Sequence, residues 1–152
     1  MKRVNVRKML WLAMVAAVTL FIWSHSLLSA EDSIEQSNAV RGVLSGWLAD
    51  SRLGQWILEN IRTVAHFAEF ALLGVAWGLR GSMTGSHDHP LPWLLLPGPL
   101  TAVADELLQL TSAGRAAQWV DLLVDSAGYL AGLVCIFLCT ALFRRLKRCK
   151  NS

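Results

Sequence analysis

The chain has 152 residues, of which 54% are hydrophobic and only 16% are charged. Soluble globular domains carry about 25% charged residues, so this composition argues against a soluble enzyme or binding module and indicates a small integral membrane protein. The length suits one compact bundle, with residues 1–152 as a single domain, and leaves no room for a second soluble domain.

The net charge of +3 is concentrated at the two ends of the chain. Nine of the fourteen basic residues flank the terminal apolar runs, namely Lys2, Arg3, Arg7, Lys8, Arg144, Arg145, Lys147, Arg148 and Lys150. Basic clusters beside apolar segments are typical of the cytoplasmic flanks of membrane spans and not of a nucleic-acid surface. We therefore expect a multi-pass protein of the inner (cytoplasmic) membrane, with both termini cytoplasmic and no nucleic-acid partner.

Four apolar runs predict an all-α polytopic membrane protein, folded as a bundle of four transmembrane helices. The predicted spans, in chain order, are residues 9–28, 63–79, 91–110 and 119–143. Pro97 and Pro99 should kink the third span or delay its start, because proline lacks an amide donor. A cleaved signal peptide is the rival interpretation of the first run, but that run is long for a signal sequence and its cleavage motif is poor.

The segment between the first two spans, residues 31–62, is polar and is expected to be irregular at first. Apolar residues then recur at helical spacing, as at Val40, Val43 and Trp47, but each stretch is too short to span a membrane. The pattern predicts a short amphipathic helix that lies on the outer surface. A loop helix packed on the bundle is the alternative.

Two pairs of glycines lie four residues apart inside predicted spans, Gly74 with Gly78 and Gly128 with Gly132. Small residues at this spacing let two membrane helices approach each other closely. We interpret them as packing sites within the bundle, and a homodimer through the same small-residue faces as the alternative.

Two further features are interpreted as ordinary. The stretch His87-Asp88-His89 lies in a turn-rich loop and is expected to be solvated rather than to bind a metal. The three cysteines are expected to be free thiols, with Cys135 and Cys139 buried in an apolar run and Cys149 in the basic tail.

Ionisable residues interrupt three of the spans, and a charge at the centre of a bilayer costs roughly 2.5–3.5 kcal/mol on insertion scales. The interrupting residues and their polar neighbours are Arg62, His66, Glu69, Asp105, Glu106, Gln109, Arg115, Asp121 and Asp125. The expected topology places all of them near the outer interface, and spacings of three or four residues give each helix one polar face. Because the inner halves of these spans lack charge, the pattern predicts an outward-facing pocket and not a pore.

Five carboxylates and two arginines share this predicted pocket, so it needs additional protons or a cation. His66, taken as the only histidine inside a span, is expected to be protonated or metal-bound. The candidate metal ligands are His66, Glu69 and Glu106, and one histidine with many carboxylates suits Mg²⁺ or Mn²⁺ better than Zn²⁺. Arg115 is expected to pair with Glu106 directly or through a ligand. A buried polar network that only fixes helix register is the alternative.

The order of these motifs resembles the VanZ-like family of small membrane proteins, named for a teicoplanin-resistance protein. The matching positions are Arg62, His66-Phe67-Ala68-Glu69-Phe70, Leu73-Gly74, Asp105-Glu106-Leu107-Leu108-Gln109, Gly114-Arg115, Asp121, Asp125 and Gly128. Phe70 stands where the family usually has tyrosine. The resemblance implies a role in the bacterial cell envelope and a lowered susceptibility to glycopeptide or lipoglycopeptide antibiotics.

Two functions are compatible with the pocket. In the first, it binds an amphiphile at the outer leaflet, such as a lipid, a lipid-linked cell-wall precursor or a lipopeptide, whose phosphate or carboxylate the arginines would hold. In the second, the protein is an intramembrane metal-dependent enzyme that acts on a lipid-linked envelope substrate, with a carboxylate as general base. A transporter is disfavoured, because no sequence repeat surrounds a polar site at mid-membrane.

Overall fold

The computed structural model describes residues 6–80 and 91–150, and every regular element in these ranges is an α-helix. The helices are α1 (Val6–Ser26), α2 (Ala30–Leu48), α3 (Arg52–Glu59), α4 (Ile61–Gly78), α6 (Leu91–Leu95), α7 (Pro97–Gln109) and α8 (Trp119–Lys150). The predicted all-α class is confirmed for these residues. The stretch His87-Asp88-His89 lies outside them.

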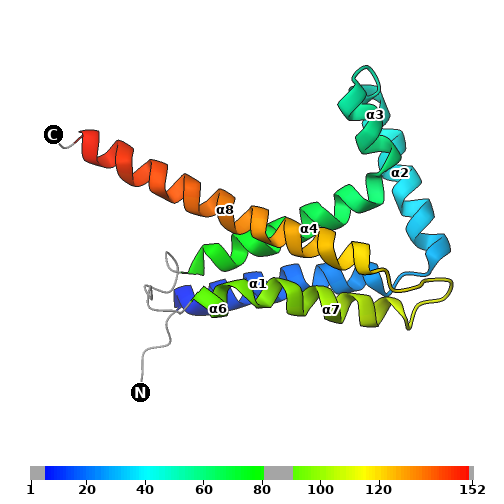
Figure 1. The fold of residues 1–152 in the computed structure, drawn as a ribbon, viewed down its shortest axis with the longest axis horizontal. Coiled ribbons are helices and arrows are strands. Elements are labelled where there is room, and N and C mark those ends of the chain that lie inside the picture. Colours follow the sequence, from blue (N-terminus) through cyan, green and yellow to red (C-terminus); the bar gives the residue numbers. More distant parts are fainter. Residues whose placement is uncertain (1–5, 81–90, 151–152) are drawn as a thin grey trace.

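Four helices, α1, α4, α7 and α8, run alternately in opposite directions, and α6 precedes α7 along the same line (Figure 1). We call the end of this bundle at which Ser26, Ile61, Gln109 and Trp119 lie the hairpin end, because the hairpin of α2 and α3 projects from it. We call the opposite end, where α1 begins and α4 and α8 finish, the terminal end.

Two helices of the described ranges are long and apolar enough to cross a membrane, judged by length and composition: Val6–Ser26 and the segment Trp119–Lys147 of α8. The other two predicted spans do not meet that measure. The helix α4 carries three ionisable residues near its start, and the third apolar run is divided between α6 and α7. Length and composition therefore support a membrane protein, with α1 and α8 as the helices that meet both criteria.

The division between α6 and α7 falls at Leu96, directly before Pro97, so the predicted interruption of the third run is confirmed. Prolines remove amide donors and leave helix carbonyls without partners. The carbonyls so affected here are those of Trp93 and Leu95, four residues before the two prolines. The carbonyl oxygen of Leu94 between them accepts a hydrogen bond from the Tyr129 hydroxyl of α8 at 2.7 Å. The tyrosine ring packs so closely here that a Cβ at Gly98 would lie 2.2 Å from it.

The helices α4 and α8 cross in close contact, and glycines make the approach feasible. A Cβ at Gly74 would lie 2.1 Å from the carbonyl oxygen of Tyr129, and one at Gly132 would lie 2.0 Å from that of Ala71. Beside this contact lies the buried apolar core, formed by Ile22, Phe70, Leu73, Ala102, Tyr129 and Leu133. The glycines thus pack one chain together, and a homodimer through the same faces would have to displace this contact.

The segment between α1 and α4 differs from the prediction. It is helical from Ala30 onward rather than irregular at first, and it forms two helices rather than one. Ser29 caps α2 by accepting a hydrogen bond from the backbone N–H of Asp32 at 3.1 Å, which is the usual role of serine at this position. The serine cap and the polar residues that favour helices therefore account for α2, although the first turns of this helix lack an apolar stripe.

The three cysteines are free thiols, as predicted, but all are exposed on α8. The prediction that Cys135 and Cys139 are buried is wrong. An apolar run places a residue in a helix without deciding which side faces a neighbouring helix, and these two sulfurs lie on the outer side of α8.

Candidate functional site

All nine residues of the predicted pocket lie toward the hairpin end, on α4, α7, α8 and the loop between α7 and α8. Five of them are buried, namely His66, Asp105, Glu106, Gln109 and Asp125. The other four, Arg62, Glu69, Arg115 and Asp121, are partly buried. The polar faces expected from residue spacing therefore turn inward, toward one another, rather than toward the surroundings of the bundle.

Asp105 is fully enclosed, with none of its surface exposed, as is Asp125. Ser26, from the last turn of α1, donates its hydroxyl to Oδ1 at 2.5 Å, and the Gln109 side-chain amide donates to Oδ2 at 2.9 Å. Both carboxylate oxygens are thus held in place, each with one further lone pair. Ser26 of α1 therefore belongs to the polar cluster, although it was not among the residues predicted for the pocket.

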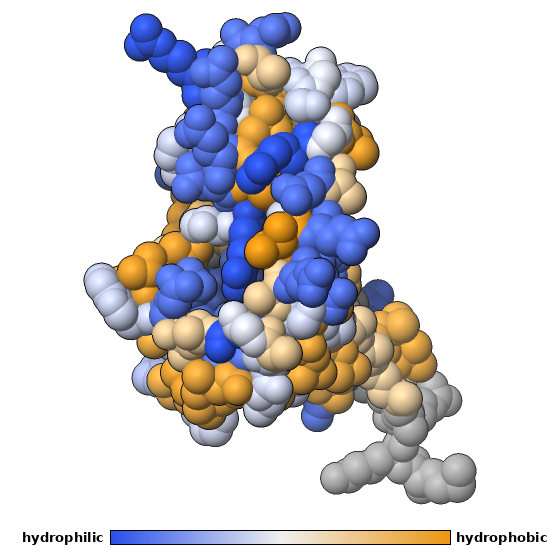
Figure 2. Space-filling view, turned by 90° about the vertical axis from the view of Figure 1, so that its right-hand side faces the viewer, coloured by the Kyte–Doolittle hydropathy of each residue, from blue (hydrophilic) through white to orange (hydrophobic). Residues whose placement is uncertain are grey.

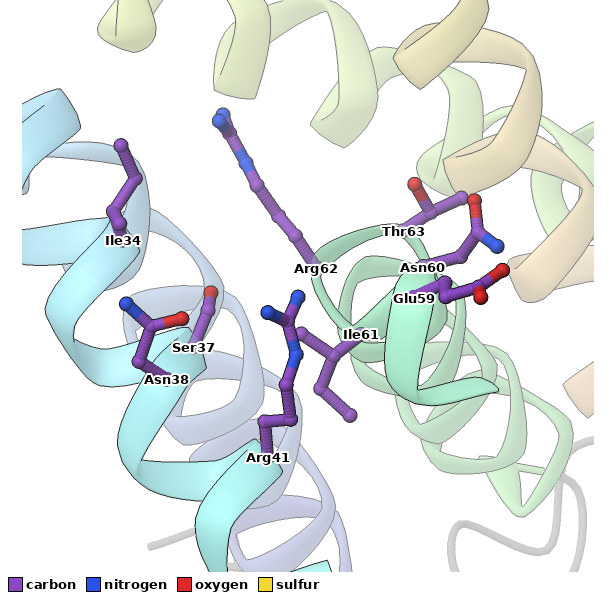
Figure 3. Close-up of a pocket in the computed structure, with 9 residues that line it drawn as sticks. All are labelled: Ile34, Ser37, Asn38, Arg41, Glu59, Asn60, Ile61, Arg62 and Thr63. Atoms are coloured by element: carbon purple, nitrogen blue, oxygen red, sulfur yellow. The ribbon is translucent and has the colours of Figure 1, made fainter. Parts of the chain in front are cut away.

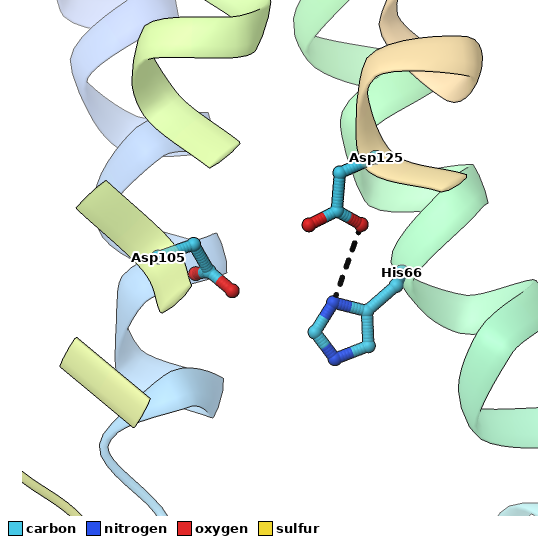
Figure 4. Close-up of side chains that lie close together, drawn as sticks. All are labelled: His66, Asp105 and Asp125. Atoms are coloured by element: carbon cyan, nitrogen blue, oxygen red, sulfur yellow. Dashed lines mark ion pairs between the residues drawn. The ribbon is translucent and has the colours of Figure 1, made fainter. Parts of the chain in front are cut away.

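His66 and Asp125 face Asp105 across the interior of the bundle (Figure 4). The Nδ1 atom of His66 lies 3.5 Å from Oδ1 of Asp125, which is longer than a good hydrogen bond. Neither this nitrogen nor either carboxylate oxygen of Asp125 has a hydrogen-bond partner among the described residues. One ligand atom from each of the three residues lies within 4.8 Å of the other two.

The remaining two metal candidates named from the sequence are engaged elsewhere. Glu69 forms an ion pair with His25, Oε1 to Nδ1, at 2.7 Å. Glu106 accepts a hydrogen bond from the backbone N–H of Gln118 at 2.7 Å, a group left without a helical partner at the start of α8. The cluster with metal-ligand spacing therefore contains His66 with two aspartates, and neither glutamate.

Arg115 does not contact Glu106 directly in the described structure. Its Nη1 atom donates a long hydrogen bond of 3.5 Å to the carbonyl oxygen of Ser26, and its Nε atom has no partner there. The direct pair is therefore not formed: Oε2 of the glutamate accepts from Gln118, and its Oε1 atom has no hydrogen-bond partner among the described residues. The charge of Glu106 nevertheless acts on the Arg115 guanidinium, so the two groups are close to each other. A ligand that joins them stays a prediction.

His25 was not predicted as a site residue, although it lies inside the first predicted span. Its partner Glu69 is on α4, and a second, longer contact of 3.4 Å joins its Nε2 atom to the side-chain amide of Gln36 on α2. The available signal was the pair of polar residues His25 and Ser26, side by side at the outer end of an apolar run. The inference that His66 is the only histidine in a span is therefore wrong.

The two arginines of the site lie near each other. Burial lowers the pKa of the Arg115 guanidinium, and the positive charge of Arg62 acts in the same direction. Neither arginine forms an ion pair with a described residue, and Arg62 has no hydrogen bond to one either. Two guanidinium groups thus share one region without a directly bound protein anion.

A cavity of about 310 Å³ lies between α2 and the start of α4. Figure 3 shows its lining, which consists of Ile34, Ser37, Asn38, Arg41, Glu59, Asn60, Ile61, Arg62 and Thr63. Arg62 is the one residue of the predicted pocket that lines it. Seen from the hairpin end, hydrophilic residues occupy the region where the hairpin meets the bundle, and hydrophobic residues dominate below it (Figure 2). The open cavity therefore lies beside the buried acids rather than around them.

Comparison with known proteins agrees with the motif pattern. Residues 9–142 match the model of the VanZ/LLP1 family, which is most of the chain and includes every residue of the candidate site. No curated protein and no solved structure gives a match. From the helical architecture, the apolar helices and a family match of this extent, we conclude that the chain belongs to the VanZ/LLP1 family, as a VanZ-like membrane protein of the cell envelope.

Proposed function

We propose that this protein binds, at the outer face of the inner membrane, the anionic headgroup of an amphiphilic or lipid-linked envelope molecule. The observation that carries the proposal is the cavity between α2 and α4, lined by two arginines from different helices, one of which, Arg62, has no partner among the described residues. Guanidinium groups bind phosphate and carboxylate in bidentate geometry. Glu59 also lines the cavity and would suit an amine on the same headgroup.

The proposed topology has four spans, α1, α4, α6 with α7, and α8. Because the helices alternate in direction, the start of α1 and the end of α8 both lie at the terminal end. The two basic clusters of the sequence flank these same helix ends. Basic flanks favour the cytoplasm, so the hairpin end faces outward. Polar side chains of α4 and α7 turn toward neighbouring helices, as polar groups within a bilayer generally do.

The apolar surface of the α2–α3 hairpin indicates how deep in the membrane the proposed headgroup site lies. It exposes an apolar surface that includes Val43, Trp47, Leu53 and Trp56, and the Trp47 side chain is 86% exposed. Tryptophan favours the headgroup region of a bilayer, and amphipathic helices lie along it. When the hairpin lies along the headgroup region, Arg41 and the nearby cavity are at the depth of the lipid phosphates.

Binding at this position would explain in physical terms how a member of this family lowers antibiotic susceptibility. A lipid-linked cell-wall precursor or a lipopeptide antibiotic would enter the cavity from the outer leaflet, headgroup first. Sequestering either molecule would lower susceptibility to glycopeptide and lipoglycopeptide antibiotics such as teicoplanin. The teicoplanin susceptibility of a deletion strain, with and without this chain, measures that consequence.

Headgroup binding is tested with the purified full-length protein in nanodiscs of phosphatidylcholine, titrated with a polyprenyl phosphate. We expect the double variant Arg41→Gln/Arg62→Gln to bind at least about tenfold more weakly, which corresponds to roughly 1.4 kcal/mol. The control is Arg52→Gln, which removes an exposed arginine of α3 that does not line the cavity. Equal affinity of the wild type and the double variant would overturn the proposal.

The topology is tested separately with reporter fusions. Fusions at Ser86 and Ser152 should report the cytoplasm, and a fusion at Gln36 on α2 should report the outside. An outside signal at Ser86 would reverse the assignment of the hairpin end, and the headgroup site would then face the wrong compartment.

A further inference from the structure

We infer that His66, Asp105 and Asp125 form a binding site for one divalent metal ion of the hard, oxygen-preferring type, represented by Mn²⁺ and Mg²⁺. None of the three residues lines the cavity between α2 and α4. The inference therefore goes beyond the headgroup proposal and stands or falls independently of it.

The three side chains converge although they lie far apart in the sequence. The three side chains come from three different helices, α4, α7 and α8, yet one ligand atom of each lies within 4.8 Å of the others. Ligands of a Mg²⁺ ion lie about 2.0–2.1 Å from it, so two donors on one ion are roughly 3–4 Å apart. Small side-chain rotations close the remaining gap, and Figure 4 shows Asp105 across from the other two.

Two of the three side chains have polar atoms without a hydrogen-bond partner among the described residues. Asp125 has no exposed surface, and both of its carboxylate oxygens lack a hydrogen bond among the described residues, as does Nδ1 of His66, which is 8% exposed. Buried polar atoms in folded proteins nearly always have a partner, and buried charges are paired or coordinate metals. A divalent cation would offset the charges of both aspartates and bind the unpartnered atoms directly.

Hydrogen bonds from outside the cluster hold one of the three ligands in place. Metal-binding carboxylates are usually held by hydrogen bonds from a surrounding shell, and Asp105 receives one such bond on each oxygen, from Ser26 and from Gln109. Glu69, the one acid of α4, contacts His25 instead of joining the cluster. Two carboxylates and one imidazole, without sulfur, favour Mn²⁺ or Mg²⁺ over soft metals.

A proton shared by the two aspartates is the competing way to relieve their repulsion, and Mn²⁺ distinguishes it from metal binding. Full-length protein in detergent is stripped with EDTA, exchanged into chelator-free buffer and titrated with Mn²⁺ under electron paramagnetic resonance. We expect one bound Mn²⁺ per chain, displaced by excess Mg²⁺, with a ¹⁴N coupling from a histidine ligand in pulsed spectra. Binding well below one ion per chain, or a bound ion without ¹⁴N coupling, would overturn the inference.

Variants identify the ligands. His66→Gln should abolish the ¹⁴N coupling, and Asp125→Asn should weaken Mn²⁺ binding at least about tenfold, whereas Glu69→Gln, which removes a neighbouring acid outside the cluster, should bind as the wild type does. Unchanged binding in both His66→Gln and Asp125→Asn would overturn the site. If a variant fails to fold, the wild-type stoichiometry and ¹⁴N coupling still decide the inference. Arg41→Gln/Arg62→Gln should retain Mn²⁺ while losing the polyprenyl phosphate, which separates the two proposals.

Discussion

The two ends of the helix bundle are built from the same helices but hold them together differently. Toward the terminal end, Trp11 donates a hydrogen bond from Nε1 to the carbonyl oxygen of Ala76 at 2.9 Å and stacks edge-on against Trp77, beside the glycine contact of α4 and α8. Toward the hairpin end, α4 and α8 instead present His66 and Asp125 to each other.

This difference shows whether helix packing in the bundle needs charged side chains. Phe70 lies one helical turn beyond His66 and packs in the apolar core, so α4 and α8 associate closely without any charged side chain there. Buried ion pairs are weak evidence for stability, because desolvation offsets their attraction. Because we propose a ligand role for the polar groups of the hairpin end, substitutions at the two ends should separate stability from function.

The largest effect on stability is expected at the glycine contact. Gly132→Leu would place a side chain where even a Cβ lies 2.0 Å from the carbonyl oxygen of Ala71. Overpacking of this kind costs about 1–3 kcal/mol or more, so we expect little monodisperse protein by fluorescence-detected size-exclusion chromatography. The matched control is Gly42→Leu on α2, where a Cβ has no neighbour within 4 Å. Equal thermal stability of the two variants would contradict the α4–α8 packing.

The largest effect on function is expected at His66. His66→Ala removes a side chain that faces Asp105 and Asp125 and leaves their charges uncompensated. We expect it to lose complementation of a deletion strain in a lipoglycopeptide susceptibility assay, at membrane abundance matched to the wild type. His87→Ala, in the predicted cytoplasmic loop, should complement fully. Full complementation by His66→Ala would leave the polar cluster as a network that only fixes helix register.

A smaller effect on stability is expected where α1 meets α4. His25→Gln removes the 2.7 Å contact with Glu69, and because both side chains are partly exposed to their surroundings we expect a loss of about 1 kcal/mol in the free energy of unfolding. A double-mutant cycle with Glu69→Gln checks the assignment. The two losses should not add, and full additivity would show that the pair does not couple α1 to α4.

The smallest effect is expected at the interruption between α6 and α7. Tyr129→Phe keeps the ring against Gly98 but removes the hydroxyl that donates to the carbonyl oxygen of Leu94. We expect a loss of about 0.5–1.5 kcal/mol, seen as a lower thermal midpoint. Ser24→Ala, which removes an exposed hydroxyl bonded to the carbonyl of Phe21, should leave the midpoint unchanged. A wild-type midpoint for Tyr129→Phe would mean that this carbonyl needs no partner.

Local signals determined most of the helices. The predicted start of the last apolar helix coincides with the first residue of α8, and the helix expected at residues 63–79 is α4, Ile61–Gly78. The interruption before Pro97 follows from a missing amide, which is a property of the residue itself. The continuation of α8 to Lys150 was not predicted, because the apolar run ends earlier, while arginine and lysine still favour a helix.

Residue spacing also determined which side chains share a face, and hence the polar side of α4, α7 and α8. It could not determine their partners. Asp105 bonds Ser26, and Glu69 bonds His25, because α1 packs beside α4 and α7 with a particular rotation and offset. The convergence of His66 with two aspartates, and the position of the cavity beside them, depend in the same way on how distant helices meet, which no local pattern of residues encodes.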